Sequence, residues 1–261
     1  MILIKSKLGL LNELYKKDFI KNPSKKIYYL GWSIIEPLAL LFVYMIFFGL
    51  IFKGRWGFNI SDPYTYGLVI FSGLIIYNLY VHSVQAFPTI ITNNKNYVKK
   101  VVFPLEILVF VPIFTAVTNA LISLFILTFC HYILIGNISY TILLSPLIVI
   151  IMIPMLAGIG YVLSIFGTLY NDLGRLVNLT NQVILFLTPI FYNLDSAPDL
   201  LKSLINIIPL TYLIEQFRLV TLYETIPSFK GLAMFVILEL IFFYLAFLFF
   251  QKYRSELANI V

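Results

Sequence analysis

Long apolar runs separated by short polar stretches dominate this chain. Six of these runs are close to or above the about 20 residues that a helix needs to cross the hydrocarbon core of a membrane. They predict spans over residues 32–52, 64–91, 103–133, 142–169, 176–191 and 229–250. We therefore expect an all-α integral membrane protein with six transmembrane helices in a single transmembrane domain, residues 1–261.

The first 30 residues predict an amphipathic helix at the membrane surface rather than a span. Apolar side chains recur at helical spacing at Leu8, Leu11, Tyr15 and Phe19. Lys16 and Lys17 lie on the other side, and Asp18 falls on the apolar flank. Such a helix suits an anionic membrane surface. An ordinary basic tail beside the membrane is the alternative.

A short basic element, residues 93–102, separates the second and third spans. It contains Lys95, Lys99 and Lys100, and Pro104 follows it. A proline suits the first turn of a helix, so we expect Pro104 to open the third span. The element is either a loop held at the headgroups by its lysines or a contact for a soluble partner, with Tyr97 protruding towards that partner.

Several spans are more polar than a helix that faces only lipid. The polar residues are Asn78, His82 and Gln85 in the second span, Thr115, Thr118, Asn119 and Ser123 in the third, and Asn178, Thr180, Asn181 and Gln182 in the fifth. Polar groups within a membrane usually face other helices or water. Glu36 is expected in the first turns of the first span, where the helix dipole stabilises a carboxylate. In the fourth span, small residues such as Gly160 and Gly167 allow close packing.

Residues 198–223 are apolar enough to enter the bilayer, yet Pro209 interrupts them. We expect two short helices, about 198–207 and 210–223, that form a re-entrant hairpin at the outer face. Irregular backbone at that depth must be covered by protein or face a water-filled cavity. Glu215 and Arg218 are three residues apart and are expected to pair. With Pro209 they make a candidate outer gate; an interfacial helix pair without a gating role is the alternative.

The distribution of charge predicts the orientation. One set of segment ends contains thirteen Lys and Arg residues: Lys5, Lys7, Lys16, Lys17, Lys21, Lys25, Lys26, Lys95, Lys99, Lys100, Arg175, Lys252 and Arg254. The other set contains five: Lys53, Arg55, Lys202, Arg218 and Lys230. By the positive-inside rule both termini, including the tail 251–261, are cytoplasmic. Residues 93–100 and the turn with Asp172 and Arg175 lie on the same side, and residues 53–62 and 137–140 lie outside.

Composition excludes several classes of protein. The chain is 61% hydrophobic and 11% charged, far from the average of soluble domains. Its net charge of +6 does not indicate a nucleic-acid binder, because the basic residues cluster at the ends of the spans. There is no Gly-rich phosphate loop, and Cys130 is the single cysteine. Glu36 and Glu239 within the membrane could relay protons, but nothing in their spacing indicates a relay.

Taken together, the motifs resemble those of the membrane subunit of ABC-type polysaccharide exporters, the family that moves O-antigen and teichoic acids. The similar segments are Leu14–Phe19; Gly31-Trp32 with Glu36-Pro37-Leu38; Gly73–Asn78; Asn93 followed by Lys99–Leu108; Asn171-Asp172-Leu173; Thr188–Tyr192; and Asn206–Glu215. The chain departs from the family where Ile76 and Tyr77 replace Pro and Trp and where Asn171 replaces Arg. Two isoleucines also lie between Asn206 and Pro209.

The resemblance implies a mechanism and partners. Two copies of the chain form the pore, and two separate ATP-binding cassette subunits hydrolyse ATP with Mg, so this chain is no enzyme and holds no cofactor. Residues 93–102 become a coupling helix, with Asn93, Lys95, Tyr97, Lys99 and Lys100 as candidate contacts. The N-terminal helix lies at the interface in the bacterial plasma membrane.

In this family the substrate is a lipid-linked glycan. Sugar rings have apolar C–H faces that pack on aromatic rings, so Tyr77, Tyr80 and Tyr192, placed near the outer ends of two spans, are candidates for the translocation path. Interfacial anchoring is the alternative for each tyrosine. Two rival functions stay open: an ABC permease for lipids or drugs, and a transporter or anchor that works without ATP, which the lack of inverted repeats argues against.

Overall fold

The computed structural model describes residues 9–15, 23–47, 63–98, 103–194 and 197–260. Within these residues every regular element is a helix and there is no strand, which confirms the all-α class. The α-helices after the short helix at 9–15 are α2 (Pro23–Tyr44), α3 (Pro63–Ala86), α4 (Lys95–Val98), α5 (Phe110–Ile135), α6 (Ser145–Leu169), α7 (Leu173–Leu187), α8 (Asp199–Ile207), α9 (Pro209–Thr221) and α10 (Phe229–Ile260). Four short 3-10 turns join them: η2 (Phe87–Thr89), η3 (Thr92–Asn94), η4 (Leu105–Ile107) and η5 (Tyr140–Leu144).

Four helical segments of the described chain are long and apolar enough to cross a membrane: Tyr66–Thr89, Leu105–Ile135, Tyr140–Leu169 and Phe229–Arg254. They lie where the sequence predicts the second, third, fourth and last spans. Gly31–Phe47 and Leu173–Leu187 are apolar but shorter, at the places of the first and fifth spans. The chain is thus a multi-pass membrane protein, and the count of six spans stays a prediction.

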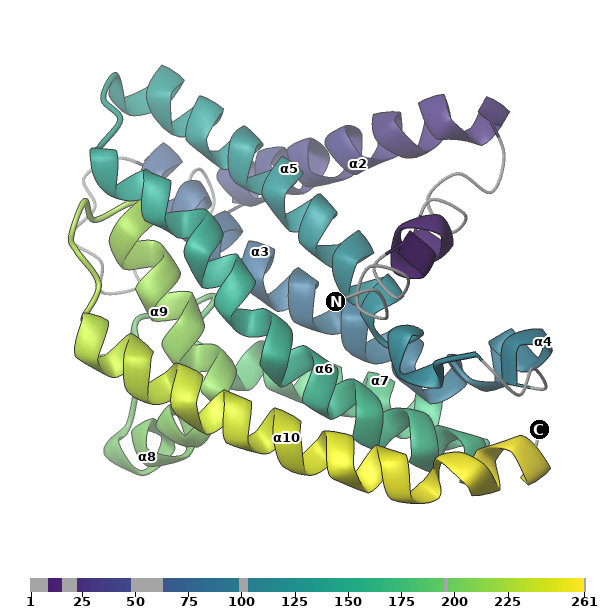
Figure 1. Cartoon of the computed structure of the whole chain (residues 1–261). Helices are drawn as coiled ribbons and strands as arrows, with labels where there is room; N and C mark the ends of the chain where they lie inside the picture. Colours follow the sequence, from purple (N-terminus) through teal and green to yellow (C-terminus); the bar gives the residue numbers. More distant parts are fainter. Residues whose placement is uncertain (1–8, 16–22, 48–62, 99–102, 195–196, 261) are drawn as a thin grey trace.

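Helix α3 lies at the centre of the bundle and α10 at its edge (Figure 1). In their most apolar stretches 78% of the α3 span is buried inside the protein, against 17% of the α10 span. α3 contacts α2, α5, α6, α7 and α9, whereas α10 packs mainly along α6. The remaining sides of α10 are apolar and exposed, as expected for a helix that faces lipid.

Glycines of α6 bring neighbouring backbone close, as the sequence predicts. A Cβ on Gly167 would lie 2.1 Å from the carbonyl oxygen of Pro88, and one on Gly160 would lie 2.3 Å from Val109 Cγ1. The neighbour of Gly167 is a backbone carbonyl, which cannot move aside as a side chain can. Gly167 therefore fixes the end of α6 against the turn η2 that follows α3.

One expectation about a helix end was wrong. α2 begins at Pro23, so Glu36 lies in the middle of that helix and not in its first turns. α10 continues to Ile260, so the segment that follows the predicted last span is also helical, and its cytoplasmic location stays a prediction. The residues after Phe250 include good helix formers such as Gln, Lys, Arg, Glu, Leu and Ala, which explains why the helix does not stop at the end of the apolar run. The expected pair of short helices is confirmed as α8 and α9, which meet at Ile208.

Candidate functional site

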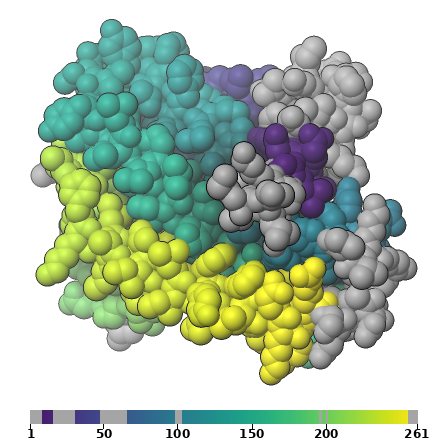
Figure 2. All heavy atoms as spheres, viewed as in Figure 1, coloured from purple at the N-terminus to yellow at the C-terminus, as the bar shows by residue number. Residues whose placement is uncertain are grey.

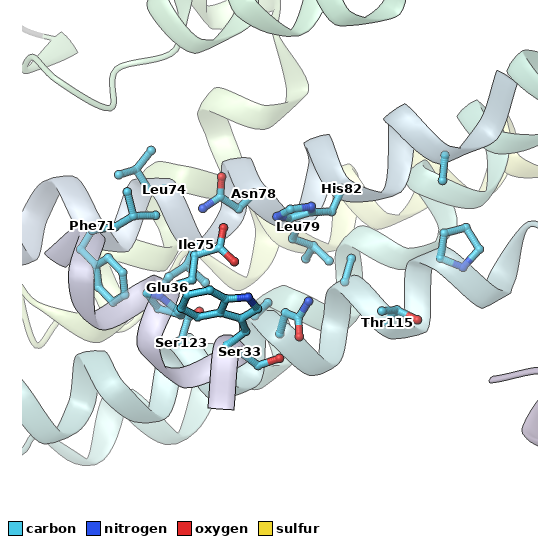
Figure 3. A pocket seen from close by; sticks show the side chains of 18 residues that line it. Ser33, Glu36, Phe71, Leu74, Ile75, Asn78, Leu79, His82, Thr115 and Ser123 are labelled. Atoms are coloured by element: carbon cyan, nitrogen blue, oxygen red, sulfur yellow. The ribbon is translucent and has the colours of Figure 1, made fainter. Parts of the chain in front are cut away.

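A polar groove of about 450 Å³ lies between α2, α3 and α5. Figure 3 shows Ser33 and Glu36 reaching into it from α2, and Asn78 and His82 from α3. Helix α5 adds Thr115, Asn119 and Ser123 to the lining. Polar side chains from three apolar helices thus gather in one place, where they offer hydrogen bonds to a polar guest inside the membrane.

Helical periodicity explains why these residues share the groove. Asn78 and His82 are four residues apart on α3, so they lie one above the other on the same face. On α5, Thr115, Asn119 and Ser123 repeat at the same interval and form a second polar stripe. The sequence already showed that these spans are polar, but Ser33 and Glu36 join the groove only because α2 packs against α3 and α5.

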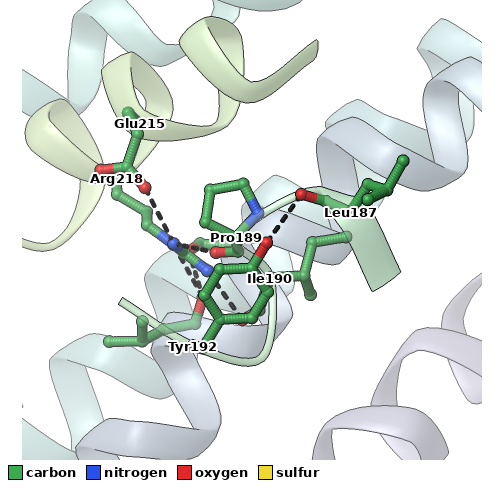
Figure 4. Close-up of polar contacts among 8 residues, drawn as sticks. Leu187, Pro189, Ile190, Tyr192, Glu215 and Arg218 are labelled. Carbon is green, nitrogen blue, oxygen red and sulfur yellow. Dashed lines mark hydrogen bonds and ion pairs between the residues drawn. The ribbon is translucent and has the colours of Figure 1, made fainter. Parts of the chain in front are cut away.

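A buried arginine holds the other end of the bundle together. Arg218 of α9 is 1% exposed and donates hydrogen bonds to three backbone carbonyls (Figure 4). The distances are 2.6 Å from Nη1 to Pro189 O, 2.9 Å from Nη2 to Ile190 O and 3.3 Å from Nε to Val69 O. The guanidinium also lies 3.2 Å from the Glu215 carboxylate, which confirms the predicted pair.

The turn after α7 supplies carbonyls because it does not continue the helix. Pro189 has no N–H, and the backbone leaves the helix at Thr188, so nearby carbonyls lack helical partners. The Tyr192 hydroxyl donates to Leu187 O at 2.7 Å, and burial raises the pKa of Tyr192, which keeps that donor protonated. Gly73 of α3 leaves room for the arginine, since a Cβ there would lie 3.0 Å from Arg218 Nη2.

At the end of the bundle away from Arg218, a second arginine connects α10 to residues 103–106, the segment just before α5. Arg254 Nη2 donates to Phe103 O at 3.0 Å, and Nη1 lies 3.5 Å from Glu106 Oε2. The ring of Phe103 stacks on Tyr97 of α4, with 4.7 Å between ring centroids. We call this set the basal clamp: Tyr97, Phe103, Glu106 and Arg254. It ties the short helix α4 to the last helix of the bundle.

The basal clamp corrects the expectation for Tyr97. Its side chain is half-buried and faces Phe103 and the bundle, so it does not protrude, because an aromatic ring at the end of an apolar core gains more from packing than from exposure. Among the described residues of this element, Asn93, Lys95 and Asn96 are exposed. Lys99 and Lys100 lie outside the described residues, so their role stays a prediction.

The N-terminal helix at 9–15 packs against the bundle. Leu14 is buried, and the Tyr15 hydroxyl lies 2.8 Å from Thr118 Oγ1 of α5, a hydrogen-bond distance. Leu14 also lines a hollow of about 370 Å³ together with Asn93, Asn94 and Tyr97. The helix therefore neighbours the α4 element. Lys16, Lys17 and Asp18 lie outside the described residues.

The structure does not bring the three candidate path tyrosines together. Tyr77 lies near the middle of α3 and at neither end of it, and its buried hydroxyl donates to Asn181 O of α7 at 2.8 Å. Tyr80 faces a different cavity, beside α10, and Tyr192 bonds within its own turn. None of the three lines the polar groove. A phenol hydroxyl inside a membrane bundle needs an acceptor, and internal carbonyls provide it for Tyr77 and Tyr192.

The remaining residues that the sequence suggested for the site lie on the surface, at the turn before α7, or at the α8–α9 hairpin. Asp172 and Arg175 form an exposed ion pair at 3.1 Å on the turn before α7. Pro209 begins α9, as its place in the sequence predicts. Within the described residues no three His, Cys, Asp or Glu side chains gather as a metal site would require.

Sequence comparison identifies the family. The model of the ABC-2 type transporter family matches residues 10–222. The chain belongs to this family. It is similar to the O-antigen export system permease protein RfbA of Myxococcus xanthus, with 20% identity over 258 residues that cover 96% of this chain and 95% of the relative. It is also similar to the protein of the same name from Klebsiella pneumoniae, with 25% identity over 227 residues and 83% of each chain.

The family match extends over the groove, the α4 element and the Arg218 cluster, so all three belong to the part of the chain that defines an ABC-2 transporter. Arg254 of the basal clamp lies beyond the matched residues. No sequence motif indicated its contact with Glu106. The only signal was a positive charge shortly after the last apolar run.

The Arg218 cluster predicts a large and specific loss of stability. Arg218→Met should lower the free energy of unfolding by about 3–5 kcal/mol, because three buried carbonyls and part of a carboxylate lose their partner. Glu215→Gln should cost only about 1 kcal/mol, because Glu215 is partly exposed and the carbonyl bonds persist. Denaturant titration of the purified variants in mixed micelles measures both. Equal losses for the two variants would show that the carbonyl bonds contribute little.

Proposed function

We propose that this chain is the membrane subunit of an ATP-driven exporter that moves a lipid-linked polysaccharide, of O-antigen or teichoic-acid type, across the plasma membrane. Two findings together carry the proposal. The chain matches the model of the ABC-2 type transporter family, and the relatives that align with it over most of their length are named O-antigen export permeases. The polar groove supports it, since a glycan has many hydroxyl groups that need hydrogen-bond partners on the way through a membrane.

In the proposed arrangement six helices span the membrane and both termini are cytoplasmic. The α4 element, the turn with Asp172 and Arg175, and the end of α10 then face the cytoplasm. The positive-inside distribution of Lys and Arg supports this orientation. The contact of Arg254 with Glu106 supports it too, because it places the end of α10 beside the α4 element.

Two copies of the chain and two ATP-binding cassette subunits form the proposed exporter. The exposed Asn93, Lys95 and Asn96 are the part of α4 and its preceding turn that a soluble subunit can reach. Movement of the ATPase subunits would displace α4, and the basal clamp would transmit that displacement to α10 and to the segment just before α5. ATP and Mg act on the partner subunits.

The re-entrant hairpin α8–α9 remains the proposed outer gate, in a modified form. Arg218 fastens α9 to the turn after α7 and to α3, so we propose that α9 moves together with the outer ends of these helices rather than alone. A permease for lipids or drugs is the second candidate. The names of the relatives disfavour it.

Reconstitution tests the proposed function. The chain should copurify with an ATP-binding cassette subunit from its own cells, and proteoliposomes of the pair should move a labelled lipid-linked glycan only with ATP. The measured quantity is the glycan that becomes accessible to a glycan-cleaving enzyme on the trans side. Transport of phospholipid probes with no glycan transport would instead favour the lipid permease.

The basal clamp makes a separate prediction about coupling. Arg254→Glu should lower the glycan exported per ATP at least about fivefold, because the charge now repels Glu106 and α4 loses its tie to α10. The double variant Glu106→Arg with Arg254→Glu should recover much of the loss. Lys252→Glu is the matched control, with the same change of charge on an exposed residue of the same helix.

Equal coupling ratios in Arg254→Glu and Lys252→Glu would contradict a role for the clamp. Insertion and dimer formation of each variant are checked first by size-exclusion chromatography, so that a folding defect is not mistaken for uncoupling.

A further inference from the structure

Another cavity, of about 600 Å³, lies where the α8–α9 hairpin meets α10. Its walls come from α3, α6, α7, α8, α9, α10 and the link between α8 and α9. Most of the lining is apolar: Met155, Ile159, Ile184, Leu210, Phe235 and Phe242. Apolar walls of this kind suit a hydrocarbon chain.

One wall of this cavity holds a buried carboxylate. Glu239 of α10 is 5% exposed, and neither of its carboxylate oxygens has a hydrogen-bond partner among the described residues. A buried polar group without a partner is costly, and a buried charge without one costs more. An unpartnered carboxylate at the edge of an open cavity therefore indicates a ligand with hydrogen-bond donors.

The other polar lining residues narrow the class of ligand. Tyr80, Asn206 and Tyr212 line the cavity with Glu239, and its described lining contains no Lys, Arg or His. An anionic headgroup without an amine, such as that of phosphatidylglycerol, would bring only negative charge to Glu239. A primary ammonium group would give Glu239 both a countercharge and N–H donors. A trimethylammonium group has the charge but no N–H.

The cavity lies on the side of the bundle that faces lipid. Figure 2 shows α10 along one edge of the molecule, and Leu238, which lines the cavity, is 58% exposed. α10 is also the least buried of the four helices long enough to span. A ligand therefore enters from the bilayer, which makes a membrane lipid the natural occupant.

We propose that this cavity binds a lipid with a primary amine headgroup, such as phosphatidylethanolamine, with the ammonium at Glu239 and one chain along Phe235 and Phe242. The bound lipid lies against Pro209 and Leu210 and so supports the hairpin at the start of α9. This proposal concerns a structural lipid and does not depend on the exported substrate.

Native mass spectrometry of the purified full-length chain tests it. The protein in detergent is titrated with phosphatidylethanolamine, phosphatidylcholine and phosphatidylglycerol that have identical chains. Phosphatidylethanolamine should bind at least about tenfold more tightly than the other two, as expected for a charge-assisted hydrogen bond. Glu239→Gln should reduce that preference to about the level of phosphatidylcholine. Glu224→Gln, which changes an exposed carboxylate in the loop before α10, should leave it unchanged.

A second variant keeps the test decisive if Glu239→Gln does not fold. Ile208→Trp fills part of the cavity and retains the carboxylate, so it should weaken the binding of phosphatidylethanolamine as well. Equal affinity for the three lipids, or undiminished binding in either variant, overturns the proposal. Because no ATPase and no glycan are present, failure here leaves the proposed export function untouched.

Discussion

A charged guanidinium inside a membrane bundle is the constraint on which one end of this protein depends. Arg218 is buried, and an unpaired cation there would be strongly unfavourable. Three backbone carbonyls and one carboxylate surround it, and they come from α3, from the turn after α7 and from α9 itself. The arginine can be satisfied only when these three parts lie together, so it specifies their arrangement.

This requirement explains several neighbouring residues. Pro189 ends α7 where the carbonyls are needed, and Gly73 leaves the space that the guanidinium occupies. The Tyr66 hydroxyl donates to Phe191 O at 2.8 Å and holds the same turn against α3. The parts of α3, α7 and α9 that meet at Arg218 thus form one unit. At the other end the basal clamp joins α4, α10 and the segment just before α5, and the tightly packed α6 lies between the two ends.

Much of this architecture follows from the sequence. The apolar runs predict where the long helices lie, Pro209 predicts the break between α8 and α9, and the spacing of Glu215 and Arg218 predicts their pair. These features depend on neighbours in the chain, which helical periodicity makes visible.

The features that the sequence could not predict depend on residues far apart in the chain. Arg218 reaches carbonyls of Val69 and Pro189, and Arg254 reaches Glu106. Backbone acceptors leave no mark on the sequence, so the role of Arg218 as an anchor was not predictable. The direction of a side chain was equally hidden. Tyr97 was expected to protrude towards a partner and instead stacks on Phe103, and Tyr77 was expected on the translocation path and instead donates to Asn181 O.

We propose that the glycan passes through the groove between α2, α3 and α5. Site-specific photocrosslinking tests that claim most directly, in the complex with its ATPase and with labelled lipid-linked glycan and ATP. A photoreactive residue in place of Asn78 or Asn119 should form a glycan adduct. The same residue in place of Leu245, an exposed position on α10, should form none above background. Adducts at position 245 alone, or equal adducts at all three positions, would contradict the assignment of the groove.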